Sequence, residues 1–114
     1  MLVQGMDELE RKFGFVPDFH DDLIESILIT PNRIELVIQT VDGPSRVQKC
    51  HGARVKLTFT DVRSFQFQGE MYGTVSIILD LWFEEKGENI ETVLETSLGT
   101  EGRIVSKEVA VSVL

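Results

Sequence analysis

The chain is poor in the residues that build disulfide frameworks and zinc sites. It has one cysteine and two histidines in 114 residues. An intramolecular disulfide is therefore impossible, and structural zinc, which takes several Cys and His ligands at fixed spacings, is excluded. No stretch approaches the roughly 18 consecutive apolar residues of a membrane span. The start of the chain has no basic region and no cleavage site typical of a secretory signal. We therefore expect a cytoplasmic protein without a membrane span.

Positive charge is also scarce. Eleven Lys and Arg residues face 19 Asp and Glu residues, which gives a net charge of −8 and a pI near 4.7. Phosphate backbones and anionic lipids attract clustered Lys and Arg, so neither nucleic acid nor a membrane is an expected partner. A basic protein is the partner that such a charge attracts fastest. Many enzymes are equally acidic, so the charge alone does not decide the function.

The residues that are present predict one globular domain over 1–114. The apolar share of 42% and the charged share of 26% are those of an ordinary folded protein. A short helix is expected over 7–13, because Met6, Leu9 and Phe13 share one face and Gly14 follows.

Alternating apolar and polar residues predict β-strands in the rest of the chain. Residues 23–30 fit a helix or a strand, but the turn pair Pro31-Asn32 and the alternation that follows it favour a hairpin. The expected strands are 23–30, 33–40, 53–60 with its continuation through Phe65 and Phe67, 75–83, 90–98 and 103–113. The strand over 75–83 is apolar on both faces, so a central place in its sheet is expected. The predicted class is α+β, predominantly antiparallel β: six to seven strands in a curled sheet, barrel-like or a sandwich, with a short N-terminal helix.

Chemically active side chains are most concentrated over 16–22, just before the first strand. This segment contains Asp18, His20, Asp21 and Asp22 around the aromatic Phe19. Short polar side chains after a proline turn commonly hydrogen-bond nearby backbone N–H groups, and here they would fix the entry of Phe19 into the core. The functional interpretation is a partner-binding cluster.

A small-ligand or metal-dependent domain is the alternative function. This alternative uses the Asp18 to Asp22 cluster: His20, Asp21 and His51 would be the minimal metal ligands, with Asp18 as a further candidate, provided that the fold brings His51 close. Further imidazole or carboxylate ligands, which such sites usually need, are missing. Neighbouring Cys50 and His51 point to opposite sides of an extended backbone, which argues against nucleophilic catalysis. Nucleophile elbows and phosphate-binding glycine runs are absent from the sequence, so we expect no enzyme activity and no cofactor.

Asp80 is a carboxylate in the middle of an apolar strand, and it needs either a partner or an exposed position. Arg54 or Lys56 could pair with it across strands. Core packing is the more common position for Trp82, and an exposed interface anchor is the alternative. The possible interface residues on this segment are Asp80, Trp82, Glu84 and Glu85.

Charge is unevenly distributed between two blocks. The basic block contains Arg46, Lys49, Arg54, Lys56 and Arg63, and the acidic block contains Glu84, Glu85, Glu88, Glu91 and Glu95. Cross-strand pairing on a solvated face is the favoured interpretation. A two-signed surface that orients a protein partner is the alternative.

Three segments together resemble a known family. They are Phe19-His20-Asp21-Asp22-x-Ile24-x-x-Ile27, the strand 33–38, and the segment 55–65 with its sequence Val-Lys-Leu-Thr-Phe-Thr-Asp-Val-Arg-Ser-Phe. The chain is similar over residues 17–68 to the bacterial immunity proteins numbered fifty in polymorphic toxin systems. The resemblance implies a non-enzymatic cytoplasmic protein that binds and neutralises a toxin, and the acidic charge suits a basic toxin domain.

A homodimer that pairs along an exposed strand edge is a further possibility.

Overall fold

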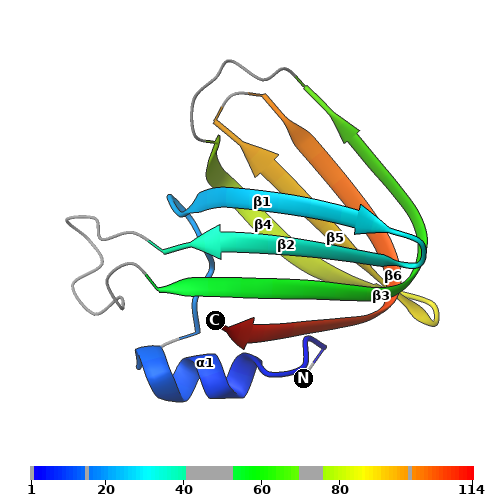
Figure 1. The fold of residues 1–114 in the computed structure, drawn as a ribbon. Coiled ribbons are helices and arrows are strands. Elements are labelled where there is room, and N and C mark those ends of the chain that lie inside the picture. Colours follow the sequence, from blue (N-terminus) through cyan, green and yellow to red (C-terminus); the bar gives the residue numbers. More distant parts are fainter. Residues whose placement is uncertain (1, 15, 41–52, 70–75, 98) are drawn as a thin grey trace.

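The computed structural model describes residues 2–14, 16–40, 53–69, 76–97 and 99–114, and within them it contains one helix and six strands. The helix is α1 (Met6–Phe13), and the strands are β1 (Leu23–Thr30), β2 (Arg33–Gln39), β3 (Arg54–Gln68), β4 (Ser76–Lys86), β5 (Asn89–Thr96) and β6 (Glu101–Val113). All strand pairs are antiparallel, and they close a barrel in the order β1-β2-β3-β6-β5-β4 (Figure 1). The predicted fold class is confirmed.

Helix α1 forms where the sequence predicts it. Met6, Leu9 and Phe13 are buried in one stripe, while the other positions of the helix face solvent. Gly14 ends the helix with a positive φ of 83°, and its N–H donates to the carbonyl oxygen of Glu10 at 2.8 Å. Among the described residues, no helix is long and apolar enough to cross a membrane.

The segment before α1 covers a strand edge. β5 pairs only with the first half of β6, and beyond Ser106 the facing edge of β6 is taken by the N-terminal segment. The Gln4 N–H donates to the oxygen of Val109 at 2.9 Å, and the Val111 N–H donates to the oxygen of Gln4 at 2.8 Å. Helix α1 then lies beside this half of β6 (Figure 1). Covering the edge in this way satisfies backbone groups that would otherwise be open to another chain.

The barrel interior is filled by the inward residues of neighbouring strands. The residues of β2 and β3 that face each other in register are 2% exposed or less: Ile34 with Phe59, Leu36 with Leu57, and Ile38 with Val55. The turn between β1 and β2 is the predicted Pro31-Asn32 pair, with Asn32 at a φ of 63°. Alternation in the sequence therefore identified both the hairpin and its buried face.

β3 is one long strand that joins the two predicted segments. Asp61 has a φ of 51°, and a bulge follows between Val62 and Ser64 in the pairing with β6. Arg63 is the extra residue of this bulge. A bulge bends its strand and increases the local twist, so β3 runs along β2 first and then turns away from it (Figure 1).

The strand over 75–83 is predicted to lie centrally, and β4 does have a strand on each side, although one of its two pairings is short. β4 pairs with β5 along its length but with β1 only at Leu23 and Ile24. A bulge between Ile78 and Asp80 also breaks the alternation, so that Ile78 and Leu81 both lie in the core. The inserted residue changes which face each later side chain occupies, and a regular period of two could not anticipate this change.

Candidate functional site

The Asp18 to Asp22 cluster forms a turn that ties the start of β1 to β4. The His20 N–H donates to Asp18 Oδ1 at 3.0 Å, and His20 Nδ1 lies 2.6 Å from the carbonyl oxygen of Leu79. A carbonyl oxygen only accepts hydrogen bonds, so Nδ1 carries the proton. The Asp21 N–H donates to the Ile78 oxygen at 2.8 Å, which extends the short β1·β4 seam.

This turn also holds an aromatic side chain in the core. Phe19 is 1% exposed although its φ is 62°, a backbone region unusual for a bulky residue. Asp21 likewise has a φ of 67°, and Asp22 is fully buried. These contacts match the expectation that the cluster positions Phe19. A partner-binding role for the exposed side chains of Asp18, His20 and Asp21 stays a prediction.

The structure brings no metal site together in the part of the chain that it describes. No group of three or more His, Cys, Asp or Glu side chains there could hold a metal ion. Cys50 and His51 lie outside the described residues, as do Arg46 and Lys49 of the basic block.

The candidate interface on β4 lies on the outer face of the barrel. Asp80, Trp82 and Glu84 alternate with the inward-facing Leu81 and Phe83. Trp82 is half-buried outside the core, and its Nε1 donates to Glu84 Oε1 at 3.1 Å. The prediction that Trp82 packs in the core is therefore wrong.

Glu85 falls on the opposite face from Trp82 by the alternation of β4. Three of the four predicted interface residues thus share one surface. The predicted pairing of Asp80 with Arg54 or Lys56 is also wrong. Arg54 binds Glu25 at 2.8 Å, and Lys56 lies 3.9 Å from Glu35, so the basic residues pair with β1 and β2.

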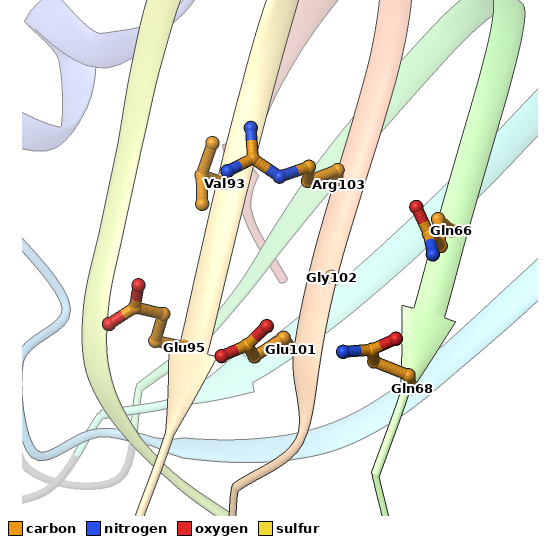
Figure 2. A pocket seen from close by; sticks show the side chains of 7 residues that line it. All are labelled: Gln66, Gln68, Val93, Glu95, Glu101, Gly102 and Arg103. Atoms are coloured by element: carbon orange, nitrogen blue, oxygen red, sulfur yellow. The ribbon is translucent and has the colours of Figure 1, made fainter.

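Three carboxylates lie directly opposite one another on neighbouring strands. Asp80 on β4 is the register partner of Glu95 on β5, and Glu95 is the register partner of Glu101 on β6. We call Asp80, Glu95 and Glu101 the acidic row. Gln68 on β3 extends the row by one position. Figure 2 shows Glu95, Glu101 and Gln68 side by side across the three strands.

Lys86 and Arg103, two cations on the strands that carry the acidic row, are already engaged by another carboxylate. Glu91 binds Lys86 Nζ at 3.0 Å through one oxygen and Arg103 Nη1 at 2.9 Å through the other. Within the described residues, no salt bridge involves Asp80, Glu95 or Glu101. Among the described residues, the acidic row therefore has no ion-pair partner in the fold.

A shallow groove runs beside the acidic row on the outer face. Its volume is about 150 Å³, and Val93 forms an apolar position among polar neighbours. Arg103 is the register partner of Val93 and lies two residues along β6 from Glu101 (Figure 2). The lining residues are Gln66, Gln68, Val93, Glu95, Glu101, Gly102 and Arg103. Carboxylates and amides of this kind bind cationic and hydrogen-bonding side chains, and none of these residues is a nucleophile of the Ser or Cys type.

Sequence reasoning found part of this surface. Glu95 belonged to the acidic block, and Asp80, Trp82 and Glu84 were candidate interface residues. Glu101 was missed, because its place opposite Glu95 depends on the register between β5 and β6.

The pKa of Glu91 predicts how this face responds to pH. Lys86 hydrogen-bonds the carboxylate and lowers its pKa below the ordinary value of 4.5, and the charge of Arg103 acts in the same direction. A lowered pKa in the folded state stabilises the protein above the unfolded pKa, and the effect is lost as the pH falls through the folded pKa. Glu91→Gln is therefore expected to lower the urea midpoint at pH 7, and the difference from wild type should shrink at an acidic pH below 4.5.

Glu88→Gln is the control for this measurement, because Glu88 is exposed in the turn after β4. Its midpoint should follow that of wild type at both pH values. A Glu91→Gln deficit that stayed constant with pH would show that packing, rather than the ion pairs, is responsible.

Comparison with known proteins does not place this chain in a family. No family model matches it, and no curated protein matches it. Over the described residues the fold defines a class, a six-stranded antiparallel barrel with one N-terminal helix. The resemblance to immunity proteins stays a prediction.

Proposed function

We propose that this protein is a non-enzymatic binding domain that docks a basic protein partner on the outer face of β4, β5 and β6. The observation that carries the proposal is the acidic row. Like charges directly opposite each other on neighbouring strands destabilise a sheet, by an amount on the order of 0.2–1 kcal/mol per pair. Such an arrangement gives the fold no benefit, whereas a cationic partner would be attracted by it and would relieve the repulsion.

The neighbouring side chains suit a protein partner. Trp82 is half-buried, lies on the same face as Asp80, and combines an apolar ring with a hydrogen-bond donor. Aromatic residues are enriched among the anchors of protein interfaces. Val93 also lines the groove beside the row, but its side chain is buried, so Trp82 is the larger accessible apolar group. An apolar centre with charged surroundings is the usual composition of such an interface.

The test is a double substitution, Glu95→Gln with Glu101→Gln. Removing the two charges should raise the free energy of unfolding by about 0.5 kcal/mol, because the repulsion between opposite residues disappears. It should also weaken capture of the partner from a lysate of the source cells by at least about tenfold, since a charged surface steers association. A residue that merely supported the fold would not produce a gain in stability together with a loss of binding.

The matched control is Glu8→Gln with Glu10→Gln, which removes the same charge from the exposed side of α1. This variant should capture the partner as wild type does, and raised salt should release the partner from both. Equal capture of the partner by the two double variants would contradict the proposal, because the net charge of the chain alone would then explain its attraction for a basic partner.

We further propose that the partner is a basic toxin domain which this chain neutralises in the cytoplasm. The support is the resemblance over residues 17–68 together with the acidic row. The captured protein should then arrest growth when expressed alone and be harmless when expressed with this chain. Co-expression with the Glu95→Gln, Glu101→Gln variant should fail to restore growth. A captured partner without toxicity would leave the binding face standing and remove the toxin-neutralising role.

A further inference from the structure

A second surface, at the end of the barrel where β1 turns into β2, has a different character. A groove of about 570 Å³ lies between this turn and the bend of β3. Ile29 is 46% exposed and Phe65 is 49% exposed. Their register partners on the neighbouring strands, Ile34 and Ile104, are nevertheless buried. The groove is therefore formed by apolar side chains on the inner side of the sheet that the fold leaves open to solvent.

The charged residue lining this groove is Arg63. It is the extra residue of the bulge in β3, so it has no register partner on β6. In the described ranges, Arg63 makes no salt bridge and no side-chain hydrogen bond, although acidic residues outnumber basic ones by 19 to 11 in the chain. Polar side chains of Thr30, Asn32 and Ser64 complete the lining.

The interior below the groove is already full. Ile34 lines both the groove and the internal void of the barrel, and that void has a volume of only about 10 Å³. It has room for one water molecule at most. A ligand of this groove must therefore lie along the surface, over Ile29, Ile34 and Phe65, and cannot enter the core.

We propose that this groove binds an apolar monocarboxylate of the fatty-acid type. The carboxylate of the ligand would accept hydrogen bonds from the guanidinium of Arg63, because the planar set of donors on a guanidinium matches the two oxygens of a carboxylate. The hydrocarbon chain would cover the exposed apolar surface of Ile29 and Phe65. A single cation in a chain with a net charge of −8 suits a monoanion better than a phosphate dianion. The volume of the groove falls in the range of about 300–1,000 Å³ that is common for small-ligand sites.

The experiment is calorimetric titration of the full chain with decanoate, 1-decanol and decylammonium below their aggregation concentrations. Decanoate should bind once per chain, and at least about tenfold more tightly than either of the other two compounds. Arg63→Gln should weaken decanoate binding by at least about tenfold and abolish the preference over decanol, because it removes a charge-assisted hydrogen bond. Amide resonances of Ile29, Ser64 and Phe65 should shift during the titration.

Arg33→Gln is the matched control. Arg33 begins β2 beside the same turn, but it is held by Glu35 at 2.9 Å. This variant should bind decanoate within about threefold of wild type. Three results would each overturn the proposal: no saturable binding at one ligand per chain, equal affinity for decanoate and decanol, or equal effects of the two arginine variants.

Discussion

Replacing Phe59 by alanine should lower the free energy of unfolding by about 3–5 kcal/mol, because it leaves a cavity that the barrel cannot close. Phe59 is fully buried, and it pairs with Ile34 on β2 and Val109 on β6, so its ring contacts the core from two sides. A loss of this size is a large part of the stability of a small domain. Urea denaturation followed by circular dichroism measures it.

Phe65 provides the control on the same strand. Its side chain is 49% exposed, and its ring contacts that of Phe67 at a centroid distance of 5.8 Å. Phe65→Ala should therefore cost about 1 kcal/mol, which is the order of an aromatic pair contact. If Phe65→Ala and Phe59→Ala lowered the free energy of unfolding by comparable amounts, the side chain of Phe65 would have to be buried in solution by a contact outside the barrel.

The second large effect is expected at Gly5, the residue before α1. Gly5 has a φ of 86°, and a Cβ atom at this position would lie against the carbonyl oxygen of Val111. Gly5→Ala thus meets two costs: a left-handed backbone, worth about 1–2 kcal/mol for an L-residue, and displacement of the N-terminal segment from β6. We expect a total loss of more than about 2 kcal/mol in the free energy of unfolding, together with faster hydrogen exchange in α1.

Gly87 separates the two costs. It also has a positive φ, 64°, but apart from its chain neighbours no atom of the described residues lies within 4 Å of the place where its Cβ would be. Gly87→Ala should show the backbone cost alone, about 1–2 kcal/mol. If both variants lost the same amount, the close approach of Gly5 to β6 would not contribute to stability.

The two proposed surfaces lie at different places on the barrel and can be tested independently. The acidic row belongs to β4, β5 and β6, whereas the groove belongs to the β1–β2 turn and the bend of β3. Substitutions at Glu95 and Glu101 should leave decanoate binding unchanged. Substitution of Arg63 should leave capture of the basic partner unchanged.

Much of the fold could be predicted from local patterns. The buried helix face of Met6, Leu9 and Phe13 follows from a period of 3.6 residues. The β1–β2 hairpin follows from the turn pair Pro31-Asn32 between two segments with strand-like patterns of apolar residues. The position of Phe19 in the core also agrees with the expectation for its turn. Each of these features depends on residues close together in the chain.

The candidate sites depended on contacts between distant residues. The bulge at Arg63 and the bulge between Ile78 and Asp80 each insert one residue and so change the face of the side chains that follow. For this reason Trp82 lies on the outside, and Arg63 lines a groove. The meeting of Asp80, Glu95 and Glu101 is set by register across three strands.

The sequence by itself determined the helix, the strands and the alternation that makes one barrel core, because propensity and periodicity act over a few residues. The tertiary structure alone decided the strand order, the bulges in β1, β3 and β4, and the acidic row. Strand pairing aligns segments that are far apart in the chain, and a change in register by one residue reverses which side chains meet. The surfaces proposed to bind a partner and a ligand are products of that alignment.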